Sequence, residues 1–68
     1  MSNWQKVFTD RMEYRAEIVK AVLEDNDMQP VLINRQDAAY HLGQYEVHVA
    51  PENVMRSIKI IKDDIKFT

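Results

Sequence analysis

The sequence contains no cysteine, one glycine and two prolines among its 68 residues. The lack of cysteine excludes disulfides and thiolate zinc sites, and a single glycine cannot build a glycine-rich phosphate-binding loop. No apolar run approaches the ~20 residues that a membrane-spanning helix needs. No basic, apolar leader begins the chain either, so we expect a cytoplasmic protein. The net charge of −2 disfavours binding of a phosphate backbone.

What remains is a globular composition, with 46% hydrophobic and 29% charged residues. A chain of this length predicts a single domain over residues 1–68. Such a domain buries only roughly 60% of its unfolded surface, so its core is marginal. Small domains usually gain stability from disulfides, a metal or another chain. Because disulfides are excluded, we expect association with another chain to be the available support.

Short runs rich in β-branched and aromatic residues predict three strands, at residues 4–8, 31–34 and 45–49. Thr9 and Asp10 interrupt the pattern of the first run. The third run alternates, so that its two sides face opposite ways. One side consists of Tyr45, Val47 and Val49, and the other of Glu46 and His48.

Two longer stretches predict helices at residues 11–26 and 52–65, because their apolar residues recur at helical spacing. The first apolar stripe consists of Met12, Ala16, Val19 and Leu23, widened by Ile18 and Val22. The second consists of Val54, Ile58, Ile61 and Ile65. A rival interpretation ends the second helix near Asp63 and makes Ile65–Phe67 a short edge strand.

The ends of these helices carry local signals. Asp10 and Glu13 have the spacing of a capping box. Asn26 is suited to a left-handed turn at the end of the first helix, and Pro51 is suited to the start of the second. Lys20 and Glu24 are four residues apart and can form an ion pair on the helix surface.

These elements, in the order β-α-β-β-α, predict an α+β domain with a three-stranded antiparallel sheet of order 1-3-2. Both helices should cover one face of the sheet, in a ferredoxin-like arrangement that lacks the last strand. The other face should be open. A lysine in mid-strand is rarely buried without a partner, so Lys6 should point to the open face. Strict alternation then takes Trp4 and Phe8 to the same face, and Val7 to the helices.

The open face should therefore carry two aromatic rings beside Glu46, His48 and Leu32. An exposed apolar patch marks a contact site unless another segment covers it. The residues leave both alternatives open, since the connection 35–44 could fold back and place Tyr40 or Leu42 over Trp4.

No catalytic constellation accompanies this surface. Asp37, Glu46 and His48 could in principle ligate a metal, but no HxxxH or HxxE spacing brings such ligands together, and His41 belongs to a connection. The hydroxyl residues have no neighbouring His–Asp pair. We therefore expect no enzymatic activity, no cofactor and no metal.

The leading hypothesis is a regulatory or interaction module that binds a protein partner or a second copy of itself. The partner-binding residues would be Trp4, Lys6, Phe8, Glu46 and His48. The alternative is a small-ligand sensor in which the connection 35–44 forms the site. Its ligand-binding residues would be Asn34, Arg35, Asp37, Tyr40 and His41. Binding of single-stranded nucleic acid is disfavoured, because the run 43–49 only faintly echoes the motif of RNA-recognition modules.

Several of these runs resemble a small prokaryotic family described as signal-transducing proteins, a family of unknown function. The resembling segments are residues 4–8, 16–24, 31–34, 46–49 and the Pro51–Glu52 helix start, and the resemblance extends over residues 4 to 62. That family usually has a glycine in the turn after the first helix, where this chain has Asp27. The resemblance implies a bacterial, cytoplasmic α+β domain. It implies no established activity and no catalytic residue.

Overall fold

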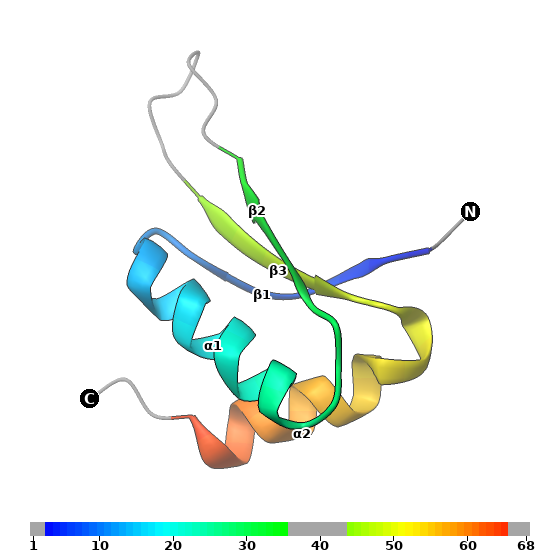
Figure 1. Cartoon of the computed structure of the whole chain (residues 1–68). Coiled ribbons are helices and arrows are strands. Elements are labelled where there is room, and N and C mark those ends of the chain that lie inside the picture. The colour runs from blue at the N-terminus through cyan, green and yellow to red at the C-terminus, as the bar shows by residue number, and fades with distance from the viewer. Residues whose placement is uncertain (1–2, 36–43, 66–68) are drawn as a thin grey trace.

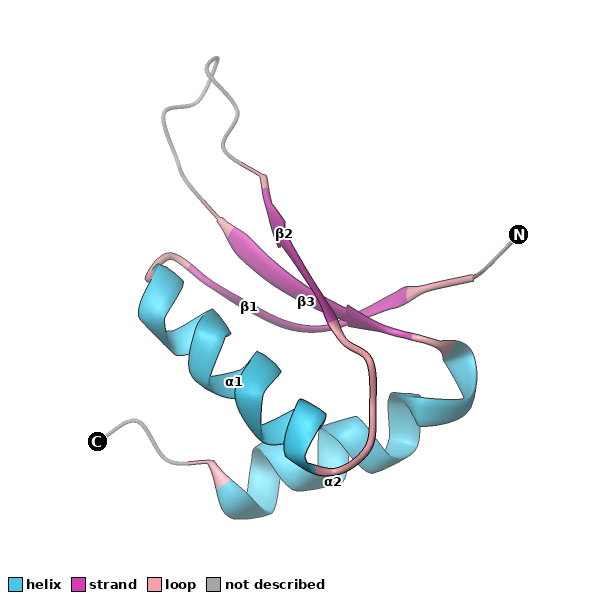
Figure 2. Ribbon diagram, in the orientation of Figure 1, coloured by secondary structure: helices cyan, strands magenta, loops and turns pink. Residues whose placement is uncertain are grey.

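The computed structural model describes residues 3–35 and 44–65. Their elements are β1 (Gln5–Asp10), α1 (Glu13–Asp25), β2 (Val31–Asn34), β3 (Tyr45–Val49), the 3₁₀ turn η1 (Pro51–Asn53) and α2 (Val54–Asp64). The strands form an antiparallel sheet of order β1-β3-β2, and both helices pack against the same face of it (Figures 1 and 2). The predicted α+β fold and strand order are confirmed.

The core lies between the covered face of the sheet and α1. Val47 and Val49 of the central strand are fully buried, as the alternation of β3 predicts. They pack with the fully buried α1 residues Ala16, Val19 and Leu23. The predicted stripe of α1 is wrong at its margins, because Ile18 is 42% exposed and Met12, 50% exposed, precedes the helix.

The start of α1 differs from the predicted capping box. Strand β1 continues through Thr9 and Asp10 instead of stopping before them, and Met12 is the residue that precedes the first helical turn. Asp10 stays close to this turn and accepts a hydrogen bond from the backbone N–H of Met12 at 2.8 Å. Its carboxylate therefore fixes the strand-to-helix corner without occupying the cap position itself.

The end of α1 is a Schellman motif. The backbone N–H of Met28 donates to the carbonyl of Leu23, and that of Asp27 donates to the carbonyl of Glu24, both at 3.1 Å. Asp27 has a φ of 65°, so the left-handed residue is Asp27 and the expectation for Asn26 is wrong. The turn carries the side chain of Met28 into the core beside Leu23.

The second helix follows η1, which begins at Pro51 as the sequence predicts. Its buried position is taken by Ser57, whose hydroxyl donates to the sulfur of Met28 at 3.2 Å. Ile58 is 48% exposed, so the predicted stripe is wrong at that position, while Val54, Ile61 and Ile65 pack at the margin of the core. The helix ends at Asp64 and Ile65 is extended. The rest of the alternative edge strand Ile65–Phe67 lies outside the described residues.

The pairing of β1 with β3 contains a β-bulge. Lys6 pairs with His48 and Phe8 pairs with Val47, so Val7 is one extra residue in β1. Residues paired across an antiparallel sheet share a face, so Phe8 lies on the covered face with Val47. Both Val7 and Phe8 pack against the core. The expectation that Phe8 points to the open face is therefore wrong, because the bulge interrupts the alternation that it assumed.

Candidate interaction surface on the open sheet face

The register of the sheet defines the residues of the open face. Lys6, His48 and Val31 form one row across the three strands, and Thr9, Glu46 and Ile33 form the next. Trp4 and Arg35 extend these rows, since Trp4 lies beside His48 and Val31 and Arg35 contacts Glu46. We use the name open face for this set, which consists of Trp4, Lys6, Thr9, Val31, Ile33, Arg35, Glu46 and His48.

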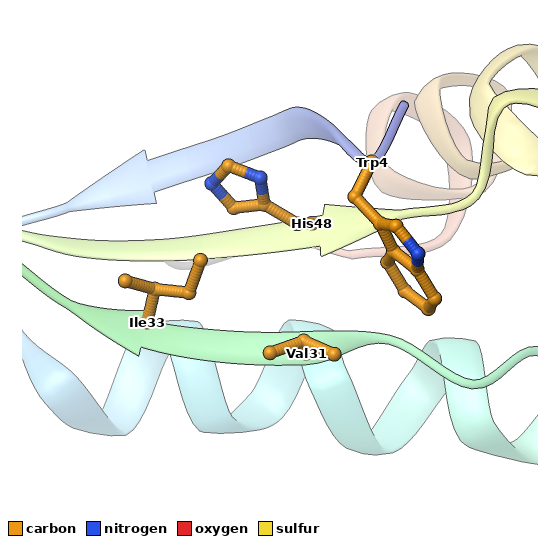
Figure 3. A pocket seen from close by; sticks show the side chains of 4 residues that line it. All are labelled: Trp4, Val31, Ile33 and His48. Atoms are coloured by element: carbon orange, nitrogen blue, oxygen red, sulfur yellow. The ribbon is translucent and has the colours of Figure 1, made fainter. Parts of the chain in front are cut away.

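An apolar pocket of about 290 Å³ occupies one part of the open face. It is lined by Trp4, Val31, Ile33 and His48. Figure 3 shows the indole of Trp4 reaching from the start of β1 across β3 toward Val31, with Ile33 and the His48 ring further along the same face. Trp4 is 36% exposed and Val31 is 44% exposed, so two large apolar side chains meet solvent here. Apolar surface of this kind is where proteins make contacts.

The polar part of the open face is centred on Glu46, whose side chain is only 9% exposed. Its Oε1 accepts from the Nε of Arg35 at 3.1 Å and lies 2.9 Å from the Nε2 of His48. Its Oε2 lies 3.8 Å from the Nζ of Lys6. An ionised carboxylate only accepts hydrogen bonds, so the Nε2 of His48 carries the proton that is donated to it.

These contacts stabilise the ionised form of Glu46. The hydrogen bond from His48 lowers the pKa of the Glu46 carboxyl, with further lowering by Arg35 and Lys6, and these effects outweigh the opposing effect of burial. Glu46 is therefore a fixed negative charge that orders three basic side chains. This is the opposite of a general acid, which needs a raised pKa.

The balance of charge on the open face is positive. Lys6 and Arg35 are two basic side chains that share one carboxylate, before any charge on His48 is counted. The carboxylate is enclosed, whereas the side chain of Lys6 is 49% exposed and that of Arg35 is 60% exposed. A partner approaching this face therefore meets cations first, although the whole chain carries a net charge of −2.

The structure regroups the residues that the sequence singled out. Trp4, Lys6, Glu46 and His48 lie together on the open face, and Phe8 does not. Leu32 pairs with Val47 and packs in the core, so its expected place on the open face is also wrong. Sequence reasoning missed Val31 and Ile33, which take that place. They could have been found only from the pairing register of β2 and β3, which places Val31 opposite His48 and Ile33 opposite Glu46.

The two described residues of the proposed small-ligand site, Asn34 and Arg35, belong to different faces of the sheet. Arg35 points back to Glu46, while Asn34 pairs with Tyr45 in the row on the other face of the sheet. Asp37, Tyr40 and His41 lie outside the described residues, as does the proposed cover of Trp4 by Tyr40 or Leu42.

Within residues 3–35 and 44–65, no three His, Asp or Glu side chains gather in a way that could hold a metal ion. In the same ranges, neither α1 nor α2 has the length and apolar character that crossing a bilayer requires.

No protein-family model matches the chain, and searches of curated proteins and of solved structures find no match either. The resemblance to the prokaryotic signal-transducing family stays a prediction from sequence, carried by residues 4–8, 16–24, 31–34, 46–49 and the Pro51–Glu52 helix start.

Proposed function

We propose that this protein is a non-enzymatic interaction module that docks a protein partner, or a second copy of itself, through the open face. The observation that carries the proposal is the pocket lined by Trp4, Val31, Ile33 and His48 on a sheet face that neither helix covers. Tryptophan and arginine are the residue types that most often dominate binding energy at interfaces, and Trp4 and Arg35 both lie on this face.

The polar network beside the pocket supports a docking role over a catalytic one. Every buried side-chain nitrogen and oxygen in the described residues has a hydrogen-bond partner. Glu46 is held in its ionised form by His48, Arg35 and Lys6 and therefore orients these side chains without being poised to transfer a proton. Rigid charged groups around an apolar anchor set the register and orientation of a partner. A cytoplasmic, regulatory role is part of the same proposal and draws on the family resemblance.

The proposal is tested by comparing three baits that carry the same photo-crosslinker in cells that make the protein. The wild type and Met55→Ser should recover the same proteins, because Met55 is an 81% exposed apolar residue on α2, away from the open face. Trp4→Ser should lose them. The solution mass of the wild type, measured over a range of concentrations, separates a partner from a second copy. Identical recoveries by all three baits, with a mass that stays monomeric, would contradict the proposal.

A further inference from the structure

We propose that the occupant of the open face is an acidic segment of another protein. One large apolar side chain of this segment enters the Trp4 pocket, and its carboxylates reach Lys6 and Arg35. This inference rests on the proposed function and adds the chemistry of the partner to it.

The apolar anchor follows from the pocket. Among the described residues, its walls are the indole of Trp4, the aliphatic side chains of Val31 and Ile33, and the His48 ring, so most of the lining is hydrocarbon. Burying exposed hydrocarbon is favourable in proportion to the apolar area removed from water, so a large apolar side chain such as leucine, isoleucine or phenylalanine fits this pocket.

The acidic flanks follow from the charges beside the pocket. Glu46 is enclosed, and its Oε1 is already shared between Arg35 and His48. Arginine presents five N–H donors in a planar fork, and Glu46 takes the one on Nε. The outer parts of Arg35 and Lys6 therefore remain available to carboxylates of a partner. Arginine forks bind carboxylates with two parallel hydrogen bonds, which also fixes their orientation.

A second copy fits this face poorly. A symmetric dimer built from two open faces would bring two copies of Lys6 and Arg35 into one interface, with only the two enclosed Glu46 carboxylates to balance them, and like charges weaken such an interface. The acidic surface of α1 offers Glu13, Glu17 and Glu24. Binding of α1 by the open face of another copy is head-to-tail, however, and leaves an unfilled face at the end of the assembly unless a ring closes.

A nucleic acid also fits less well than an acidic segment. Binding of a phosphate backbone needs many cations, and binding of bases needs several stacking rings. Among the described residues of the open face, Trp4 is the only aromatic residue apart from the His48 imidazole, and Lys6 and Arg35 share one carboxylate.

The test is a selection of random peptides displayed on phage against the folded wild type, with Trp4→Ala and Val31→Ser used separately for counter-selection. We expect the peptides that prefer the wild type to combine a large apolar residue with Asp or Glu. Their affinities can be measured through the fluorescence of Trp4, the only tryptophan in the chain. Lys6→Gln and Arg35→Gln should each weaken binding about three- to fivefold, as expected for partly exposed ion pairs. Lys59→Gln, on the exposed surface of α2, is the matched control and should leave the affinity unchanged.

The failures can be told apart. Peptides that need Trp4 but show no enrichment in Asp or Glu would overturn the acidic chemistry and leave the docking surface standing. Peptides that bind Trp4→Ala and Val31→Ser as well as the wild type would overturn both proposals. Oligothymidylate that displaces the selected peptides and binds more tightly than they do would replace the acidic segment with a nucleic acid.

Discussion

The five residues of β3 point alternately to the two faces of the sheet, and the two faces receive different kinds of side chain. On the covered face, Val47 and Val49 are fully buried and pack in the hydrophobic core. On the open face, Glu46 and His48 form the centre of a polar network, and the apolar residues Trp4 and Val31 stay partly exposed beside it. The covered face thus supplies stability, whereas the open face carries groups that a contribution to the core does not explain.

This contrast has a physical cause in the cost of burial. A carboxylate placed at Val47 would lose its hydration without gaining partners. Glu46 gains three basic partners because it points to the open face. There, Lys6 reaches it from β1, Arg35 from the end of β2 and His48 from β3 itself. The open face can therefore hold a nearly buried charge, which the covered face cannot.

The largest expected effect comes from a matched pair of valines on opposite faces. Val47→Ala should lower the free energy of unfolding by about 2–3 kcal/mol, because it removes buried hydrocarbon and leaves a cavity. Val31→Ala, at a residue that is 44% exposed, should change it by no more than about 0.5 kcal/mol. Urea denaturation of both variants measures the difference. Equal losses would mean that the open face is also part of the core.

The next effect concerns the centre of the open face. Glu46→Gln should lower the free energy of unfolding by about 1–2 kcal/mol at neutral pH, because charge-assisted hydrogen bonds are replaced by weaker neutral ones. Equilibrium unfolding measures this loss. Glu17→Gln on the exposed surface of α1 serves as the control for the removal of one negative charge. A Glu46→Gln variant as stable as Glu17→Gln would show that the network orders side chains without stabilising the fold.

The pH dependence of the stability loss in Glu46→Gln shows whether the loss comes from the negative charge of Glu46 or from the packing of its side chain. The pKa of the Glu46 carboxyl is lower in the folded protein, chiefly because of the hydrogen bond from His48. Its contribution is therefore complete above the ordinary pKa of a glutamate, about 4.3, and is lost as the pH falls through the lower folded-state pKa. The gap in stability between the wild type and Glu46→Gln should shrink with acid over this window. A gap that stays constant in urea titrations from neutral pH to the acid limit would contradict the assignment.

The smallest effect concerns the turn that leads into β2 beneath the covered face. Asp27 adopts a left-handed conformation that glycine adopts without steric cost. Asp27→Gly should raise the free energy of unfolding by about 0.5 kcal/mol, and Asp27→Ala should lower it by a similar amount. Thermal unfolding of the two variants measures both changes. A loss of stability in Asp27→Gly would mean that the carboxylate itself has a stabilising role in the turn.

Periodicity was enough to predict the fold. The alternation of β3, the spacing of Ala16, Val19 and Leu23, and the proline before α2 each carry their information within a few residues. The order of the strands was predicted from a right-handed crossover between β1 and β2, with β3 placed between them. The apolar patterns of β3 and α1 predicted the structure correctly because most of the residues that form them are buried in the core.

The open face was only partly predictable because it depends on relations between distant residues. The bulge at Val7 leaves no mark in composition, yet it decides that Phe8 enters the covered face while Lys6 does not. The pairing of Glu46 with Arg35 joins residues eleven positions apart and needs the register of β2 against β3. In α2, a serine occupies the buried position because its hydroxyl finds the sulfur of Met28, and an apolar pattern cannot signal this.

The extra residue in β1 also bears on how this chain tolerates changes in length. Lys6 and Phe8 already pair with adjacent residues of β3, so a shorter strand in which they were neighbours would keep the same register on either side. Losing Val7 would thus remove one side chain at the margin of the core and reverse none of the others. A deletion inside β3 would instead exchange the two faces for every residue beyond it, and the sheet would present its valines to water and its charges to the helices.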